Sequence, residues 1–440
     1  MTGAAARLGR RWAILGGGIL GMRLAGNLAE TGDHVELFES APALGGLAGV
    51  WTIGDVTWDK HYHVVLRSDR HLLGLLEELD LKREIRWTRT RAGFYSGGRL
   101  HSLSDALDFL RFPLLGPFQK LRLAATILRA AQIRDWRKLE RITVSSWLIR
   151  WSGRATYERI WLPLLRAKLG EGYRTASAAF IWATIQRLYG ARRAEKKREE
   201  FGFVTGGYSR ILKRFEDHLR ERRVEIHLNR AARLVERAGA RLAVDFAGGR
   251  REEFDRVVVT VPAPEAARIC PGLALEETTR LEQVRYQGIV CASLISTHPL
   301  SDYYVTYITD SGIPFTGIVE MSALAGREPF GGNSLTYLPK YVAPDDPAFR
   351  LSDEEIAAQF LPALERMYPH FRRSDVLAFR VSRVRHVFPV PKLNYSRRLP
   401  PIKSSIPGLF FVNSAQIVNG TLNVNETLAL AGQALSLLKE

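Results

Sequence analysis

Cysteine is scarce in this chain: only Cys270 and Cys291 occur among 440 residues. Two cysteines cannot build a disulfide framework, and they form neither a C-x-x-C motif nor a metal-ligand group. We therefore expect no metal site, and the reducing cytoplasm is the expected compartment. Apolar runs of about 20 residues are also missing, so no helix that spans a bilayer is expected.

Several signatures of function are missing as well. The sequence holds no Ser/His/Asp set, no P-loop, no internal repeat and no recognisable nucleic-acid module. Its formal charge of +17 suits nucleic acid, an acidic membrane surface or anionic substrates. Because the basic residues are scattered, nucleic acid is the least favoured partner. A length of 440 residues with 46% hydrophobic content predicts two or more packed lobes.

The first 39 residues follow a strand, glycine turn, helix and strand pattern. An apolar run, 12–15, leads into Gly16, Gly18 and Gly21 in G-x-G-x-x-G spacing, and a helical pattern follows. The glycines permit a tight turn, let backbone approach a pyrophosphate, and let helix and strand pack closely. Glu39 ends the next strand, about 20 residues further on, and can bind ribose hydroxyls. The pattern predicts a dinucleotide site.

A second glycine-rich loop, residues 42–49, follows Glu39 directly and favours FAD over NAD. Such a loop lets backbone amides reach the far part of a longer cofactor. A second G-x-G-x-x-G unit is missing, so we expect no dedicated lobe for a nicotinamide cofactor. The residues expected to contact the dinucleotide here are Gly16, Gly18, Ile19, Leu20, Gly21, Glu39, Ser40, Gly46, Leu47 and Ala48.

From Gly16 to Gly49 the chain resembles the flavoprotein group of amine oxidases, protoporphyrinogen oxidases, phytoene desaturases and UDP-galactopyranose mutases. Two further segments resemble the same group in the same order: the double-glycine segment 202–208 and the closing strand 407–413. The resemblance implies that the backbone near Ala232 lies against the adenine. At the position of Asn413 many relatives carry an acid that contacts the ribityl chain of the flavin. Asn413 keeps hydrogen-bonding capacity but lacks the charge, and it is counted among the expected cofactor contacts.

A helix follows Asn423, Val424 and Asn425 near the C-terminal end. Either asparagine can act as its N-cap. A helix N-terminus directed at the flavin would stabilise negative charge on the reduced ring. We therefore count these three residues among the expected cofactor contacts, with a capped helix that makes no flavin contact as the alternative.

The expected fold class is α/β, with α+β character overall. It combines a Rossmann-type FAD-binding lobe containing a parallel sheet with a substrate lobe of mixed or antiparallel sheet and a helical insertion. The flavin lobe is discontinuous, at 1–70, 201–275 and 395–440. The helical insertion covers 71–200, and the substrate lobe covers 276–394.

Residues 103–135 carry many apolar side chains, with Arg122 and Arg129 on one side of a helix. Apolar residues flanked by arginine suit a helix that lies in a membrane interface. They suit equally well a lid packed over an apolar cavity. The expected location is therefore the cytoplasm, with peripheral contact at the inner face of a membrane as an open alternative.

Candidates for catalysis must reach the flavin ring, which carries the redox step. His63 matches a histidine that the mutases place beside the flavin, and His61 has weaker support. Tyr337, Lys340 and Tyr341 end a strand of the expected substrate lobe, and the two tyrosines share a face. We assign His63, Lys340 and Tyr337 to catalysis and Tyr341 to substrate binding. The alternatives are a structural histidine at position 63 and a surface lysine at position 340.

Arg383 and Arg385 alternate on another expected strand and point to one side. Paired guanidinium groups bind carboxylate or phosphate well, so both are candidates for substrate binding. A basic, solvent-facing side of the sheet is the alternative.

The resemblance implies an FAD-dependent oxidoreductase that transfers hydride between flavin N5 and a small apolar substrate. Isoprenoid and lipid-linked molecules are among the candidate substrates. Reoxidation would then use oxygen, a quinone or another carrier. One alternative is a mutase-like enzyme that uses reduced FAD on a UDP-sugar without net redox change. Another is a flavin-bound scaffold without enzymatic activity, whose hallmark would be a buried flavin with no open cavity.

Overall fold

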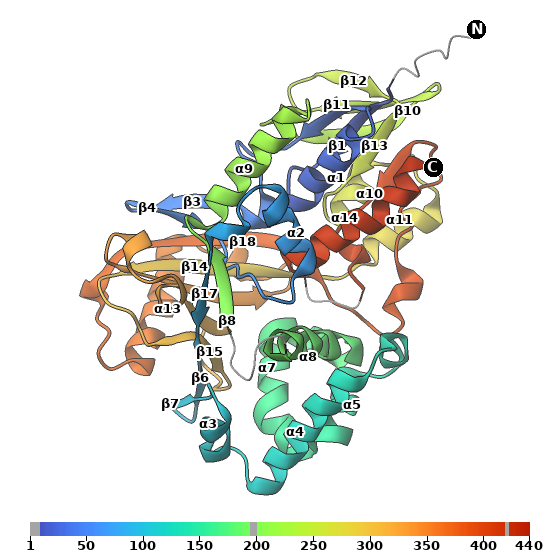
Figure 1. Ribbon diagram of the computed structural model, residues 1–440. Helices are drawn as coiled ribbons and strands as arrows, with labels where there is room; N and C mark the ends of the chain where they lie inside the picture. Colours follow the sequence, from blue (N-terminus) through green and yellow to red (C-terminus); the bar gives the residue numbers. More distant parts are fainter. Residues whose placement is uncertain (1–8, 194–199, 419–421) are drawn as a thin grey trace.

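Three regions follow one another along the long axis of the molecule (Figure 1). The computed structural model describes residues 9–193, 200–418 and 422–440. A parallel sheet with its helices lies at one end, a mixed sheet lies in the middle, and a group of helices forms the opposite end.

The parallel sheet draws its strands from the beginning, middle and end of the chain. Its order is β19-β13-β1-β2-β9, and all neighbouring strands run parallel. Both faces are covered, which explains why its strands read as apolar runs. The strands are β1 (Arg11–Leu15), β2 (His34–Phe38), β9 (Glu225–His227), β13 (Arg256–Val259) and β19 (Leu409–Phe411).

Helices and a small sheet cover the two faces. On one face, α1 (Ile19–Ala29), α9 (Gly207–Glu221) and α14 (Val424–Lys439) pack in one hydrophobic core. On the other face lie α10 (Ala263–Ile269), α11 (Leu275–Glu282) and a three-stranded antiparallel sheet. That sheet contains β10 (Ala232–Ala238), β11 (Arg241–Phe246) and β12 (Arg251–Phe254).

The central sheet has seven strands in the order β18-β14-β17-β16-β15-β6-β7. Neighbours are antiparallel except for β15 and β6, so the sheet is mixed. Helix α13 (Asp353–Met367) packs against one face. The strands are β6 (Arg91–Ser96), β7 (Arg99–Ser102), β14 (Tyr286–Ser296), β15 (Tyr303–Ile308), β16 (Gly317–Glu320), β17 (Ser334–Val342) and β18 (Val376–Pro389).

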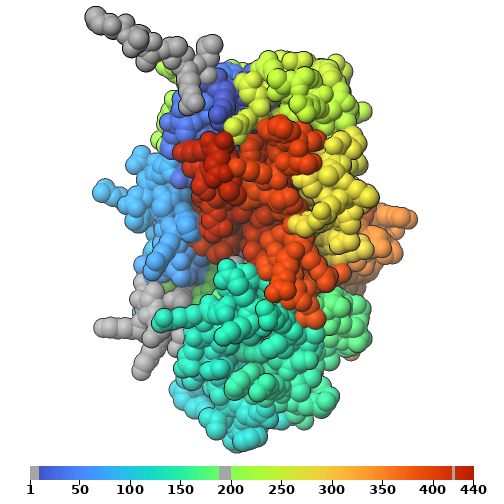
Figure 2. Space-filling view, turned by 90° about the vertical axis from the view of Figure 1, so that its right-hand side faces the viewer, coloured from blue at the N-terminus to red at the C-terminus, as the bar shows by residue number. Residues whose placement is uncertain are grey.

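The helical end has a hydrophobic core of its own. Figure 2 shows it as the part of the surface farthest from the three-stranded sheet. Its main helices are α3 (Ala106–Arg111), α4 (Pro117–Gln132), α5 (Val144–Ser152), α7 (Leu162–Leu169) and α8 (Ala178–Arg193). The expected fold class is confirmed: a parallel Rossmann-type sheet, a mixed sheet and helices between them in sequence.

The segment 71–200, expected to be a helical insertion, contains strands as well. β6 and β7 join the central sheet, and β5 (Ile85–Arg89) pairs with β8 (Glu200–Val204). Helix α2 (Arg70–Glu78) packs into the core of the parallel sheet. These strands are short and partly exposed, so their two-residue alternation is weak in the sequence. Within the described residues, no helix is both long and apolar enough to cross a membrane.

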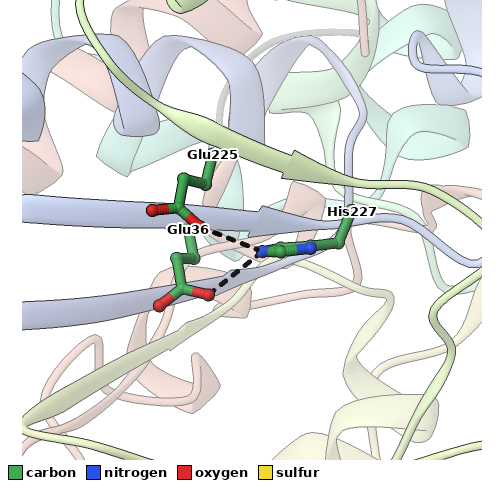
Figure 3. Close-up of side chains that lie close together, drawn as sticks. All are labelled: Glu36, Glu225 and His227. Carbon is green, nitrogen blue, oxygen red and sulfur yellow. Dashed lines mark hydrogen bonds and ion pairs between the residues drawn. The ribbon is translucent and has the colours of Figure 1, made fainter.

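A charged network ties β2 to β9 at the outer part of the parallel sheet (Figure 3). Glu36 and Glu225 lie directly opposite each other, which is unfavourable for two carboxylates. His227 Nε2 lies 3.0 Å from Glu36 Oε2 and 3.8 Å from Glu225 Oε2. Arg11 Nε donates to Glu36 Oε1 over 2.6 Å. The ligand-type atoms of Glu36, Glu225 and His227 lie within 4.8 Å of one another. We interpret the group as an ion network because Arg11 already compensates Glu36.

This network predicts unequal roles for its two carboxylates. Glu36→Gln should lower the free energy of unfolding by roughly 2 kcal/mol, because Arg11 and His227 lose a buried partner. The Glu36 side chain is 2% exposed and that of Glu225 is 53% exposed. Glu225→Gln is the matched control and should cost less than about 0.5 kcal/mol. Denaturant unfolding measures both, and equal losses would contradict the central role of Glu36.

Candidate functional site

One large cavity, with a volume of about 1270 Å³, connects the three regions. It begins at the carboxyl ends of β1, β2 and β13, where ligands of open α/β sheets bind. It continues past the central sheet to the helices of the opposite end. Of the residues expected at the site, these line it: Gly16, Gly18, Ile19, Leu20, Glu39, Ser40, Gly46, Leu47, Ala48, His61, His63, Ala232, Tyr341, Asn423, Val424 and Asn425.

The first glycine turn is held in a conformation that only glycine accepts. Gly16 has a φ of +118°, and its N–H donates to the Phe38 carbonyl over 2.8 Å. A Cβ on Gly16 would lie 2.4 Å from Thr260 Oγ1, which donates to the Leu15 and Gly16 carbonyls. A Cβ on Gly21 would lie 1.9 Å from the Gly16 carbonyl oxygen. Gly21 therefore shapes the turn without lining the cavity.

Glu39 and the second glycine loop complete the cradle. The Glu39 carboxylate accepts N–H bonds from Gly17 over 2.7 Å and from Ala41 over 2.8 Å. Its remaining lone pairs can accept hydrogen bonds from ribose hydroxyls. A Cβ on Gly46 would lie 3.2 Å from Gly18 Cα, so the two loops touch through backbone. Free N–H groups at the start of α1, beside Gly18, suit a pyrophosphate.

The start of α14 closes the cavity from another side. Asn423 caps this helix by accepting the Glu426 N–H over 3.1 Å. Asn425 Oδ1 accepts the N–H groups of His71 and Leu72, at 2.9 and 3.3 Å, and so fixes α14 to α2. This geometry places the N-terminal end of α14 at the cavity.

Asn413 is placed differently. It is fully buried, and its Oδ1 accepts the Ala415 N–H over 3.0 Å. Its Nδ2 has no hydrogen-bond partner among the described residues. The next residue, Ser414, lines the cavity in its place. Asn413 thus supports the loop after β19, and its unpaired amide faces no described acceptor.

Two neutral histidines lie where the glycine loops meet the central sheet. His61 Nδ1 donates to the Leu47 carbonyl over 3.1 Å, and His63 Nδ1 donates to the His61 carbonyl over 2.8 Å. Burial lowers the pKa of each imidazole from 6.5 to about 4. Both rings are therefore uncharged near pH 7. Each bond assigns the proton to Nδ1, which leaves Nε2 as an acceptor.

Tyr337 and Lys340, both assigned to catalysis above, do not line the cavity. The Tyr337 hydroxyl donates to the Asp59 carbonyl over 2.7 Å, and the side chain is fully buried. It therefore joins the central sheet to the hairpin of β3 (Val50–Ile53) and β4 (Val56–Asp59). Because side chains alternate along a strand, Lys340 lies on the same face of β17 as Leu338, which packs on the side of α13. A catalytic role for either residue has no support from this geometry.

Arg383 and Arg385 share a face of β18, as expected, but the face is the one away from the cavity. Arg383 pairs with Asp353 over 2.7 Å. The guanidinium of Arg385 lies 4.7 Å from the centre of the Phe349 ring. The intervening residue, Val384, lines the cavity instead. This geometry gives no support to a substrate-binding role for the two arginines. Alternation in the sequence shows that they share a face of the strand but not which face meets the cavity.

Sequence reasoning missed the most unusual side chain of the cavity wall. Lys168, on α7, directs its ammonium at the Tyr341 ring, with 3.6 Å between Nζ and the ring centre. Tyr341 in turn bonds to Tyr62 through their hydroxyl groups over 2.8 Å. One signal was available, because Lys168 lies within the apolar run that ends at Leu169. Nothing in the sequence shows what α7 faces.

The cavity combines a glycine cradle, the Glu39 carboxylate and two neutral histidines, which is the pattern of a dinucleotide-binding flavoprotein. The chain belongs to the family of flavin containing amine oxidoreductases, which it matches over residues 21–423. The family and the flavin cofactor expected from the sequence are thereby confirmed, and the cradle fits FAD.

Individual relatives share parts of the sequence. The zeta-carotene desaturase of Synechocystis sp. is 28% identical over 210 residues, which cover 41% of this chain and 42% of that protein. The coproporphyrinogen III oxidase of Mycobacterium tuberculosis is 29% identical over 287 residues, covering 60% and 62%. Both alignments span less than two thirds of the relative. A crystal structure of reduced UDP-galactopyranose mutase is 14% identical, covers 98% of this chain and 96% of that one, and has a TM-score of 0.74; this likeness shows the fold alone.

The close contact at Gly21 predicts a specific loss of cofactor. Gly21→Ala should yield protein with little bound FAD, because the new Cβ forces the Gly16 carbonyl out of the turn. Gly74→Ala, on α2, is the control: its Cβ would meet no atom within 4 Å. The control should keep full flavin content and gain up to about 1 kcal/mol in stability. The ratio of flavin absorbance to protein measures both. Full flavin content in Gly21→Ala would contradict the packing argument.

Proposed function

We propose that this protein is an FAD-dependent oxidoreductase that acts on a largely apolar small molecule, with hydride transfer between a substrate carbon and flavin N5. The observation that carries the proposal is the continuity of the cavity. The same space that begins at the glycine cradle ends among Ile127, Trp161, Leu164, Leu165 and Ile181. A substrate held among these side chains would be apolar.

FAD, when bound, supplies the redox chemistry by accepting or donating two electrons and a proton equivalent. The chain supplies position and environment. His61 and His63 remain neutral near pH 7 and add no charge beside the reacting centre. The apolar side chains of α7 and α8 displace water from the substrate. Of the three residues assigned to catalysis, His63 lines the cavity, whereas Lys340 and Tyr337 do not.

The two alternatives find less support. A mutase-like activity on a UDP-sugar needs cations for a diphosphate, and Arg383 and Arg385 face away from the cavity. Three arginines do line the cavity. Arg187 is paired with Asp69 over 3.1 Å and Arg268 with Glu265 over 3.0 Å, and Arg230 lies at the cradle beside Glu39. A scaffold without activity would need no substrate space, whereas the cavity extends well beyond the glycine cradle.

Anaerobic mixing of the purified yellow protein with candidate substrates tests the proposal. Zeta-carotene and coproporphyrinogen III are suitable first probes, because relatives are named for them. An oxidisable substrate should bleach the visible flavin absorbance, and air or a quinone should restore it. Turnover of UDP-galactopyranose only after chemical reduction would support the mutase instead. A colourless protein that takes up no added FAD would refute the whole assignment.

The helical end carries a surface suited to a lipid bilayer. Phe118, Leu121 and Leu128 on α4 are 70%, 68% and 50% exposed, and Leu107 and Leu110 on α3 are 60% and 65% exposed. Helix α4 contains Lys120, Arg122 and Arg129 but no acid. Apolar side chains with basic neighbours favour an anionic interface. Because Ile127 of the same helix lines the cavity, an apolar substrate could pass from lipid to the site over a short path.

Sedimentation with lipid vesicles tests this contact. A Phe118→Ser, Leu121→Ser double variant should bind vesicles of phosphatidylcholine and phosphatidylglycerol at least about tenfold more weakly, since two large apolar side chains no longer insert. Leu275→Ser is the matched control, because Leu275 is 83% exposed on α11, outside the helical end. Equal binding by all three proteins would remove the membrane from the proposal. The flavin content should be the same in each.

A further inference from the structure

Beyond the glycine cradle, the described part of the cavity wall holds one cation without a counter-charge. Arg230, which also lacks a described ion pair, lies at the cradle itself, where its backbone N–H donates to the Glu39 carbonyl. Lys168 extends from α7 into the cavity, and its Nζ lies 3.6 Å from the centre of the Tyr341 ring and 4.9 Å from that of Phe388. Among the described residues, no carboxylate lies within ion-pair distance of it, and no hydrogen bond satisfies its ammonium protons. The face of an aromatic ring attracts a cation but cannot accept three N–H bonds.

The acids of the cavity are already engaged. Glu39 accepts the Gly17 N–H at the cradle, Asp69 pairs with Arg187, and Glu265 pairs with Arg268. None of these carboxylates is therefore available to Lys168. A lysine in an apolar wall with no acidic neighbour is costly to keep charged. A ligand that brings a negative charge would offset this desolvation free energy directly.

The surroundings limit what such a ligand can be. Around Lys168 the cavity wall is formed by Trp161, Leu164, Leu165 and Tyr341. A single ammonium among apolar side chains matches one negative charge on an otherwise apolar molecule. A diphosphate would need further cations. Arg187 and Arg268 are paired with their own acids, and Arg230 lies at the cradle beside Glu39.

We propose that Lys168 forms a subsite that binds the carboxylate of an apolar substrate, and so fixes the direction in which that substrate lies in the cavity. The proposal rests on the proposed function and narrows its substrate class to apolar carboxylic acids. Tyr341 takes part by holding the ammonium over its ring while its hydroxyl is fixed by Tyr62. Lys168 is thus a residue for specificity and positioning, with no bond made or broken at its nitrogen.

The titration of Lys168 agrees with this role. Burial lowers the pKa of its ammonium from 10.5 to about 7, so charged and neutral forms are both populated near neutral pH. A bound carboxylate would favour the charged form, whereas a bound alcohol would not. The other ionisable groups close to it are the phenols of Tyr341 and Tyr62, whose pKa values burial raises above their ordinary range. Both phenols stay neutral, and neither can replace the missing anion.

Binding of matched ligands to the FAD-loaded protein tests the proposal. Dodecanoate and 1-dodecanol share a chain and differ in charge, and calorimetry at one pH measures both. The native protein should prefer dodecanoate by roughly tenfold or more, as expected for a hydrogen-bonded ion pair away from water. Lys168→Met should reduce the preference to within about twofold while it keeps the affinity for dodecanol, because Met fills similar apolar space. Lys213→Met, at an exposed lysine of α9, should behave like the native protein.

Each other outcome has a defined meaning. Yellow native protein that binds both ligands equally would overturn the subsite and leave the proposed function intact. That measurement needs no variant, so a failure of Lys168→Met to fold does not weaken it. Dodecyl phosphate that binds more tightly than dodecanoate, and only when Lys168 is present, would overturn the choice of a carboxylate. Protein without bound FAD would instead contradict the proposed function.

Discussion

The parallel pairing of β1 with β13 and of β13 with β19 is the constraint on which the site depends. It brings residues 11–15, 256–259 and 409–411 into register, although about 240 residues separate the first two segments and about 150 separate the last two. Because the strands are parallel, their carboxyl ends meet at one edge. Thr260 can therefore reach under the Gly16 turn, and Ser414 can reach the same cavity from the end of the chain.

Charge within the cavity is arranged so that most of it is neutralised locally. The Glu39 carboxylate is held by two backbone N–H groups, Asp69 by Arg187, and the two histidines are kept neutral by burial. Because these charges are neutralised locally, the interior between the cradle and α7 is apolar. Against that background Lys168 is exceptional, since its only described partners are aromatic rings. The net charge of +17 comes mostly from basic residues at the surface, and no lysine or arginine is among the fully buried described residues.

The sequence predicts the cradle well because its chemistry is local. Gly16, Gly21 and Glu39 are set by turn geometry and by a strand and helix that are contiguous in the chain. For the side chains of the central sheet, the position relative to the cavity is not set by local sequence. Alternation shows that Arg383 and Arg385 share a face, but the face that meets the cavity depends on where β14 and α13 pack, and that is decided by distant residues. Lys168 was missed for the same reason, since its contact with Tyr341 joins α7 to β17, two segments that lie far apart in the chain.

Helix α4 shows how the helical end, far from the glycine cradle, can determine which substrates enter the cavity. Ile127 faces the cavity while Leu121 and Leu128 face outward, so a single helix, about 10 Å across, separates the interior from the surface. A molecule that enters beside α4 meets apolar side chains throughout, and the first charge it can encounter on the α7 wall is Lys168. An apolar chain with one carboxylate end would match both features of this path. Its apolar body would replace water along the wall, and its carboxylate would supply the negative charge that Lys168 lacks among the described residues.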